Sequence, residues 1–431
     1  MTLSVRLDRG ALIFLTSIVI IGVFGSVASS AVTAANSVSV LVPGTLLSSY
    51  WDEALRRFTA KTGIEVEVLV ASGWDDLREK VTVMVAAGIA PDAVYHDSGA
   101  QGHLVYNGSV RALDEFVARD QFDLSIWPAS VIQGYAYDGK LYGLPTGISN
   151  FTWYYNADKL SAVGVGELLT DWDNETEFLF DDMVTIAKKA TIDHDGDGRP
   201  EQFGLQDFGN FGAQALEMWE LSYINEARTA FVAAGDAHIS AINQIRSLWQ
   251  EHGVVGGSFL QGTAVMVQIQ PYYLNTLRDA MDRGGLFKWK NAVNPKAVCR
   301  CSLAAFHSWG MPKDSPNPDG GWELIKFMTA DPEGAILFNQ AENRIPVLRE
   351  AIVRFLDRWE TINPGQNAFV LTDSLNYLAR STAAGLPRDV WNNWYAAMQR
   401  VMRGEVDTAI AMKQLEPVIN GILAEYHARK Q

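Results

Sequence analysis

The chain has 431 residues, of which 48% are hydrophobic and 20% are charged, a composition typical of a soluble globular protein. This length exceeds what one hydrophobic core usually holds, so two domains are expected. The net charge of −15 argues against nucleic acid and anionic membrane surfaces as partners.

The N-terminal segment has the three-part layout of a secretory signal peptide. Arg6 and Arg9 precede an apolar run over residues 11–24, and small residues follow, with cleavage predicted within residues 32–35. A retained membrane anchor would need ~20 apolar residues, which this run reaches only by counting its Gly- and Ser-rich end. No cysteine stands directly after the apolar run, where a lipoprotein would carry its lipid. Residues 1–35 are therefore predicted to be removed, leaving a soluble protein in the periplasm.

Helical and strand patterns then alternate, as an α/β architecture requires. Residues 37–42 predict a first strand, and a loop with Thr45 follows it. An amphipathic pattern predicts a helix over residues 51–62 that stops at Gly63. A strand over residues 64–70 and a helix over residues 77–87 complete the first units.

The next segment places polar side chains at the end of a buried strand. Gly88 ends the helix, Pro91 bars further helix, and residues 93–95 form a short apolar run typical of a parallel strand. His96, Asp97 and Ser98 follow directly. Open α/β sheets bind ligands outside the carboxyl ends of their strands, so these side chains are candidate ligand contacts. The alternative is an ordinary loop in which Asp97 caps the following helix.

An acidic turn lies at Asp193, Asp195 and Asp197, with Gly198 after the third carboxylate. Alternate carboxylates followed by glycine match the start of a calcium-binding loop. The EF-hand version needs a glutamate at its twelfth position, where this chain has Gly204. A plain Asx-rich surface turn is the favoured interpretation, and a structural calcium ion is the alternative.

The only cysteines, Cys299 and Cys301, are separated by one residue. An oxidising compartment permits a disulfide, but residues i and i+2 of a strand lie near the upper limit of bridgeable separation. A disulfide that needs a bend and a pair of free thiols both remain open.

Familiar catalytic signatures are missing from the sequence, including GxSxG, HExxH, a Walker loop and CxxC. A carbohydrate-active enzyme is therefore the weaker hypothesis. A ferric-ion receptor is a second alternative, because adjacent tyrosines occur at residues 154–155 and 272–273. No carboxylate and histidine partners with a matching spacing accompany them.

Five segments resemble one family in its own order along the chain. Residues 81–98 resemble its "AxGxxPDVV" segment, and residues 143–160 its "GLPxxxxxxxLYYNKDL" crossover. Residues 50–69, 262–275 and 309–334 match its remaining motifs. The chain thereby resembles the extracellular solute-binding proteins of ABC importers, of the sugar-binding type that includes maltose-binding protein.

The resemblance implies an α/β, two-lobed periplasmic-binding-protein fold of type II. Each lobe would be a mainly parallel sheet flanked by helices, with the ligand cleft between the lobes. The first lobe would comprise residues 36–147 and 304–360. The second would comprise residues 148–303 and 361–431, with C-terminal helices over residues 389–402 and 408–426 packed on it.

The resemblance also implies a function and a set of ligand contacts. The protein would be a monomeric receptor that closes on a sugar, oligosaccharide or polyol, needs no cofactor, and delivers its ligand to a membrane permease. Polar contacts would come from both the first lobe and the crossover, and aromatic rings would stack on the sugar, although each ring has a core role as its alternative. The implied contacts are Thr45, His96, Asp97, Ser98, Ser149, Asn150, Tyr272, Trp309 and Trp394.

Overall fold

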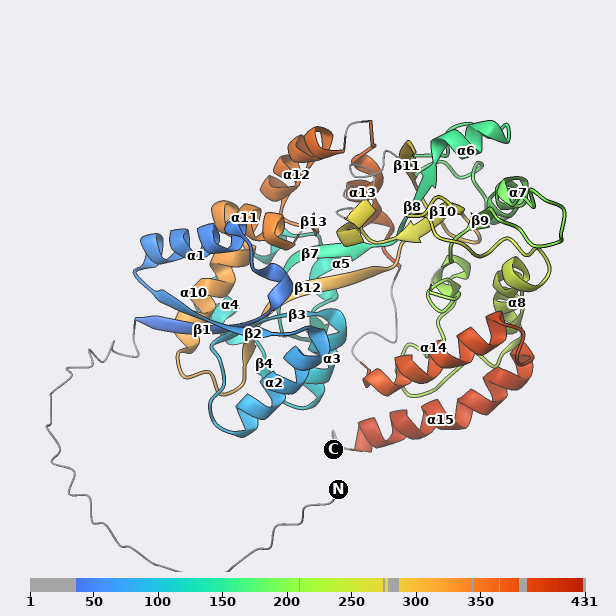
Figure 1. Cartoon of the computed structure of the whole chain (residues 1–431). Helices are drawn as coiled ribbons and strands as arrows, with labels where there is room; N and C mark the ends of the chain where they lie inside the picture. The colour runs from blue at the N-terminus through green and yellow to red at the C-terminus, as the bar shows by residue number, and fades with distance from the viewer. Residues whose placement is uncertain are drawn as a thin grey trace, which may run out of the picture.

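The computed structural model describes residues 36–208, 210–273, 276–277, 287–342, 344–363, 365–379 and 386–428. Two separate sheets, each covered by helices, form two lobes side by side (Figure 1). The predicted signal peptide, residues 1–35, lies outside the described residues. Within the described part of the chain, no helix is long and apolar enough to cross a membrane.

The first lobe is built on a seven-stranded sheet with the order β13-β7-β12-β3-β1-β2, and β4 pairs with β12 off this path. Its strands are β1 (Ser37–Pro43), β2 (Glu65–Ala71), β3 (Ala93–Asp97), β4 (Val110–Arg111), β7 (Leu144–Asn150), β12 (Ala304–Pro312) and β13 (Ile345–Pro346). Its helices are α1 (Ser49–Thr62), α2 (Trp74–Ala86), α3 (Ser98–Tyr106), α4 (Asp114–Arg119), α5 (Ala129–Gln133), α10 (Pro318–Thr329), α11 (Pro332–Glu342) and α12 (Arg349–Ile362). Short pieces complete it: η1 (Gly44–Leu46), η2 (Leu124–Ile126), β5 (Ala136–Tyr137) and β6 (Lys140–Leu141).

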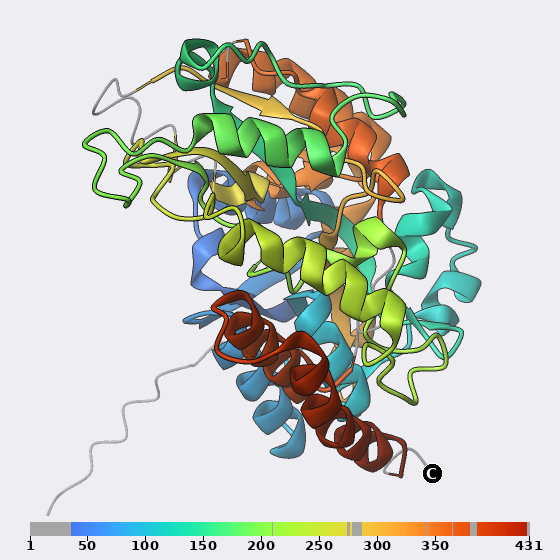
Figure 2. The ribbon, with the colours of Figure 1, turned by 90° about the vertical axis from the view of Figure 1, so that its right-hand side faces the viewer.

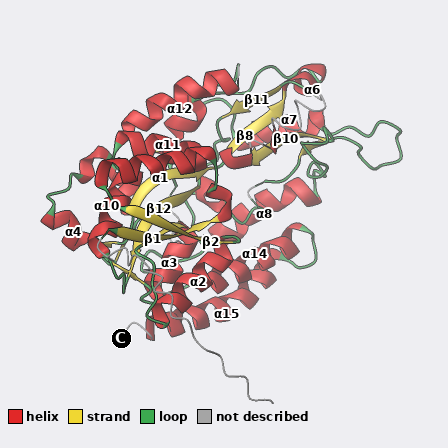
Figure 3. Ribbon diagram, turned by 60° about the vertical axis from the view of Figure 1, so that its left-hand side comes forward, coloured by secondary structure: helices red, strands yellow, loops and turns green. Residues whose placement is uncertain are grey.

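Helices cover both faces of this sheet, as Figure 3 shows for α1, α10 and α11 on one side and α2 and α3 on the other. The alternation within β1 explains the two layers. Val40 and Val42 belong to the core that includes residues of α1 and α10, while Leu41 packs with Leu77 of α2 and Leu104 of α3. Successive side chains of a strand point to opposite faces, so the buried run is apolar throughout.

The second lobe contains a four-stranded sheet with the order β11-β8-β10-β9. Its strands are β8 (Thr152–Asn156), β9 (Phe203–Leu205), β10 (Ala264–Ile269) and β11 (Trp289–Ala292). Its helical elements are α6 (Ala157–Ala162), α7 (Phe180–Ala190), η3 (Leu216–Trp219), α8 (Asp236–Gln250), η4 (Pro271–Tyr273), α13 (Phe369–Thr372), η5 (Asp373–Tyr377), α14 (Arg388–Met402) and α15 (Thr408–Ala428).

The helix predicted over residues 51–62 is present as α1, with capping residues at both ends. The side chain of Ser48 accepts a hydrogen bond from the Trp51 N–H (3.3 Å) and begins α1, and Gly63 ends it with a φ of 73°. That left-handed φ suits glycine, so the predicted stop is confirmed. The predicted two-lobed α/β fold is confirmed as well.

Strand directions are more mixed than predicted. In the first lobe β1 runs parallel to β2 and β3, but β12 is antiparallel to both β3 and β7. In the second lobe β8 is antiparallel to β10 and β11, and only β9 and β10 are parallel. The expectation of mainly parallel sheets was therefore wrong in detail, because β8 and β12 follow connections that arrive from the opposite lobe.

The chain changes sheets at Phe151, between β7 and β8, and again over residues 293–303, between β11 and β12. The first change comes after Asn150 rather than after Gly147 as predicted. β7 remains paired with β12 as far as Asn150 opposite Ala304, so the last residues of β7 belong to the first sheet.

The C-terminal helices α14 and α15 pack with α8 on the second lobe, as predicted, and lie at its lower edge in Figure 1. Figure 2 shows α15 and α8 on the side of the molecule that faces the viewer after the turn. The end of α15 also reaches the first lobe. Tyr426 stacks on Tyr106 of α3 with ring centroids 4.6 Å apart. The two lobes therefore touch at a point distant from the crossing strands.

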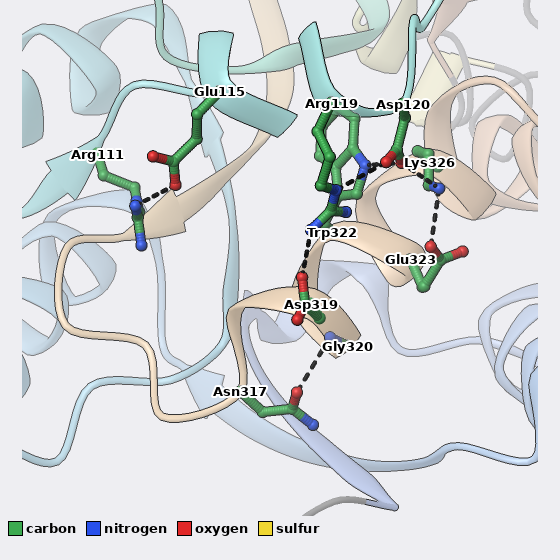
Figure 4. Close-up of polar contacts among 10 residues, drawn as sticks. All are labelled: Arg111, Glu115, Arg119, Asp120, Asn317, Asp319, Gly320, Trp322, Glu323 and Lys326. Carbon is green, nitrogen blue, oxygen red and sulfur yellow. Dashed lines mark hydrogen bonds and ion pairs between the residues drawn. The ribbon is translucent and has the colours of Figure 1, made fainter. Parts of the chain in front are cut away.

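A polar network fastens α4 to α10 on the first lobe (Figure 4). The Asp120 carboxylate accepts hydrogen bonds from Arg119 Nε (2.8 Å), Trp322 Nε1 (2.7 Å) and Lys326 Nζ (2.9 Å). Arg119, Lys326 and Trp322 hold the pKa of this carboxyl well below its usual range. Because the Trp322 ring is fully buried, its N–H has no access to solvent and depends on Asp120.

We expect Asp120→Ala to lower the free energy of unfolding by about 1–3 kcal/mol, since the buried N–H of Trp322 loses its acceptor. The lowered pKa means that Asp120 stabilises the fold above its unfolded pKa and that this contribution is lost as the pH falls. Urea unfolding at pH 7 and at acidic pH measures both effects. Asp319→Ala is the control, because that side chain is 77% exposed and its pair with Arg119 contributes at most about 1 kcal/mol. Equal losses in the two variants would contradict the role of Asp120.

Candidate functional site

The predicted first-lobe contacts lie at the carboxyl ends of β1 and β3, but they differ in exposure. Thr45 is exposed in η1, and Ser98 is half-buried at the start of α3. Asp97 caps α3, because its carboxylate accepts a hydrogen bond from the Ala100 N–H (2.6 Å). The capping alternative is thus observed, and a further role for Asp97 in ligand contact stays a prediction.

His96 does not face an open cleft, which corrects the sequence-based expectation. Its ring is fully buried, with Nδ1 within 3.1 Å of the Ser308 hydroxyl. Burial lowers the pKa of His96 to about 4, so the ring is neutral. Its Nε2 lies against Gly310, where a Cβ would come within 2.6 Å. Glycine at position 310 therefore makes room for the histidine between β3 and β12.

Ser149 and Asn150 are fully buried at the end of β7 and tie the crossing strand to its surroundings. The Ser149 hydroxyl accepts from Arg344, and the Ser149 carbonyl accepts from Gln270 Nε2 of the second lobe (3.1 Å). Asn150 donates to Ser374 of η5. These contacts give both residues a structural role at the crossing, and ligand contact stays a prediction for them.

Two of the three predicted stacking aromatics are core residues in this structure. Trp309 is fully buried among Trp51, Tyr95 and Phe338, and stacks on Trp51 with an interplanar angle of 8°. Trp394 is fully buried in the core of the second lobe. Neither ring presents a face to a cleft here, because residues from distant segments cover both.

The third aromatic, Tyr272, lies in η4, the turn that follows β10. Tyr272 therefore stands at the end of a second-lobe strand. Its contact with a ligand stays a prediction.

A small polar pocket lies in the second lobe beside both crossing connections. Its volume of about 10 Å³ gives room for about one water molecule. The pocket combines side-chain amides and a carboxyl group with apolar walls, and its lining residues are Phe151, Gln214, Ala215, Glu217, Met218, Gln268, Asn294, Cys301 and Leu303.

Glu217 contributes a buried carboxyl group to this pocket. It is only 8% exposed, and its Oε2 has no hydrogen-bond partner among the described residues. Burial raises the pKa of Glu217 to about 7. The Gln214 Oε1 atom is likewise buried without a partner in the described part of the chain. Two unpartnered acceptors at one pocket can take hydrogen bonds from a single water molecule, which the pocket has room to hold.

Sequence reasoning missed this pocket. The one available signal is that Glu217 stands between the apolar residues Leu216 and Met218, which suggests burial of its whole turn. Nothing in the sequence connects this turn with Gln268 or Asn294, which only the fold brings to it.

The acidic turn at residues 193–201 folds as a surface loop. The Asp193 carboxylate accepts hydrogen bonds from the backbone N–H groups of Gly196 (2.7 Å) and Gly198 (2.8 Å). Carboxylate oxygens of Asp193, Asp195, Asp197 and Glu201 lie within 4.8 Å of one another, and all four residues are exposed. The structure thus adds Glu201 to the three aspartates that the sequence gives as candidate calcium ligands. The backbone N–H groups of the turn hydrogen-bond the Asp193 carboxylate, so the conformation of the loop is accounted for by the turn itself. Calcium binding stays a prediction.

The adjacent tyrosines at residues 154–155 pack on opposite sides of β8. Tyr155 belongs to the second-lobe core and Tyr154 to the first. Each hydroxyl has a protein partner: Tyr154 accepts from Thr152 (3.3 Å), and Tyr155 accepts from the Leu168 N–H (3.2 Å). Burial raises the pKa of Tyr155 to about 12 and that of Tyr154 further. This pair is therefore unsuited to supply tyrosinate ligands for iron.

We expect Asp97→Ala to lower the free energy of unfolding by about 0.5–2 kcal/mol, because α3 loses its N-cap. Asp97→Asn should restore most of this loss, since asparagine is also a good cap. Denaturant unfolding gives the stability, and calorimetry with a bound solute gives the affinity. A stability that is unchanged in Asp97→Ala would contradict the capping role, and an unchanged affinity would remove Asp97 from the ligand site.

Comparison with known proteins places this geometry in context. The profile of a family described as bacterial extracellular solute-binding protein matches residues 53–354. The galactooligosaccharide-binding protein of Bacillus subtilis is 20% identical over 401 residues, which cover 88% of this chain and 87% of the relative.

Solved structures also share the fold. The sugar-binding protein MalE from Xanthomonas citri has a TM-score of 0.74 and 17% identity, covering 91% of this chain and 98% of its own. An ABC substrate-binding protein from Listeria monocytogenes, in complex with cycloalternan, has a TM-score of 0.73 and 20% identity, covering 90% and 99%. Because the family profile spans most of the sequence and the fold agrees, this chain belongs to the family of bacterial extracellular solute-binding proteins.

Proposed function

We propose that this protein is the periplasmic receptor of an ABC importer and that it captures a neutral sugar, oligosaccharide or polyol between its two lobes. Family membership supports a binding role, and a relative named for galactooligosaccharide binding supports the class of ligand. In this proposal the N-terminal segment is a cleaved signal peptide, and the protein binds its ligand without chemically changing it.

The observation that carries the proposal is the pair of lobes joined by crossing connections. A ligand that contacts both lobes stabilises the closed arrangement by its differential affinity for that state. The membrane permease would recognise the closed form and release the ligand for transport.

The charge balance of the chain favours a neutral ligand over an anionic one. The net charge of −15 disfavours a strongly anionic solute. A neutral saccharide or polyol would bring no charge into the space between the lobes.

Thermal unfolding of the chain from residue 36 onward, with a panel of solutes, tests this function. The panel contains neutral di- and trisaccharides, polyols, amino acids and ferric citrate. A binder present at about 100 times its Kd stabilises the folded state by about 2.7 kcal/mol, and we expect this from a saccharide or polyol. Stabilisation by an amino acid or ferric citrate alone would overturn the proposed ligand class. Chromatography of the bound saccharide after incubation should show no product, and a product would overturn the role of pure receptor.

A further inference from the structure

The end of α15 on the second lobe meets the end of α3 on the first lobe, away from the connections that cross between the sheets (Figure 1). The ring of Tyr426 stacks on the ring of Tyr106, with centroids 4.6 Å apart and an interplanar angle of 27°. Tyr426 is only 4% exposed, and Tyr106 packs against the hydrophobic core of the second lobe although it belongs to the first. A helix end of one lobe is therefore seated against the core of the other.

The end of α15 is fixed to the second lobe by hydrogen bonds on both sides of Tyr426. The Asn420 side chain accepts a hydrogen bond from the Phe231 N–H (2.8 Å). The His427 ring donates from Nε2 to the Arg228 carbonyl (2.9 Å). Because both partners belong to the same loop of the second lobe, the ring of Tyr426 moves with that lobe.

The end of α3 is fixed to the first lobe in its own way. The Asp97 side chain caps the start of the helix. Leu104 is fully buried and packs with Leu41 of β1 and Leu77 of α2. Tyr106 is the last residue of this helix, so its ring moves with the first sheet.

Each ring is therefore attached to a different lobe, and the lobes cannot separate at this point while the rings stay stacked. A rotation of one lobe about the crossing connections must break the pair. A contact that exists only while the lobes are together stabilises that arrangement over the separated one. The interaction of an aromatic pair corresponds to roughly a twofold to tenfold change in this equilibrium.

We propose that Tyr106 and Tyr426 form a latch that holds the two lobes together without the help of a bound solute. The latch sets the fraction of the solute-free protein in which the lobes are closed. In the receptor function proposed above, on which this step rests, the apparent Kd for a solute rises as the closed fraction falls. The latch thereby adjusts the affinity without contacting the solute.

Small-angle X-ray scattering of the dialysed protein, without added solute, tests the latch. We expect Tyr426→Ala and Tyr106→Ala each to increase the radius of gyration, because the lobes separate in a larger share of the molecules. Tyr426→Phe keeps the stacked ring and should scatter like the wild type. Circular dichroism checks that each variant is folded. The half-buried position of Tyr106 lets Tyr106→Ala carry the test if Tyr426→Ala unfolds.

Tyr395→Ala provides the matched control on the second lobe. The ring of Tyr395 contacts Trp391 and Phe211, which belong to the same lobe, so this variant should keep the radius of gyration of the wild type. Folded alanine variants of Tyr106 and Tyr426 that scatter like the wild type would overturn the proposal. Equal expansion of the Tyr395→Ala control would also overturn it.

A double-mutant cycle determines whether the two rings act through each other. Once one ring is removed the contact is lost, so the variant that carries both Tyr106→Ala and Tyr426→Ala should expand no further than either single variant. An expansion equal to the sum of the two single effects would contradict a shared latch. These measurements need no solute, so a solute screen that fails for saccharides and polyols overturns the proposed ligand class and leaves the latch unaffected.

Discussion

Replacing Glu217 with glutamine is expected to remove a large pH dependence from the stability of this protein. Burial raises the pKa of Glu217 from 4.5 to about 7 in the folded state. Between these values the unfolded chain releases the proton while the folded chain keeps it. The free energy of unfolding therefore falls as the pH rises from 4.5 to about 7, by roughly 3 kcal/mol in total.

Glu217→Gln keeps the shape of the side chain but cannot ionise, so its stability should change less over this range. Urea unfolding at several pH values between 4 and 8 measures the difference between the two curves, in which all other titrating groups cancel. Glu220→Gln, three residues further along and exposed, serves as the matched control and should follow the wild-type curve. Parallel curves for wild type and Glu217→Gln would show that Glu217 is not the group responsible.

The second large effect is expected at Trp394, where a core role and a ligand-stacking role make different predictions. The ring is fully buried, lies 4.5 Å from Tyr223 with an interplanar angle of 4°, and donates from Nε1 to the Ala213 carbonyl (2.9 Å). Trp394→Ala removes all these contacts and leaves a cavity. We expect it to lower the free energy of unfolding by about 3–5 kcal/mol.

Trp391 on the same helix provides the matched control. Its ring is partly exposed and stacks on Tyr395, so Trp391→Ala should cost at most about 1 kcal/mol. Denaturant unfolding of both variants gives the comparison. If Trp394→Ala were as stable as Trp391→Ala and lost only affinity for a solute, Trp394 would be a ligand contact and not a core residue.

Much of the fold could be predicted because its signals are local. The helix over residues 49–62 has a capping serine before it and a glycine in the left-handed conformation after it, and both act within one turn. The short apolar run at residues 93–95 became a central strand of the first sheet, as its composition indicated. The resemblance of five ordered segments then supplied the two-lobed arrangement, which periodicity alone does not contain.

The candidate site was harder to predict, because exposure depends on segments that meet only in the folded chain. His96 follows the predicted strand, but Ser308 and Gly310 of β12 cover it, more than 200 positions further along the sequence. The spacing of Trp391 and Trp394 shows that they share a helix face, but not which ring the neighbouring elements bury.

The sequence by itself determined the class of this protein: its helices and strands, its family and the positions where the strands end. These properties depend on residues close together in the chain, on overall composition and on the order of motifs. Only the tertiary structure decided that Glu217 is buried beside Gln268, Asn294 and Cys301. The physical reason is that burial and the pKa shifts it causes arise from distant segments packing together, and no local pattern records which segments will meet.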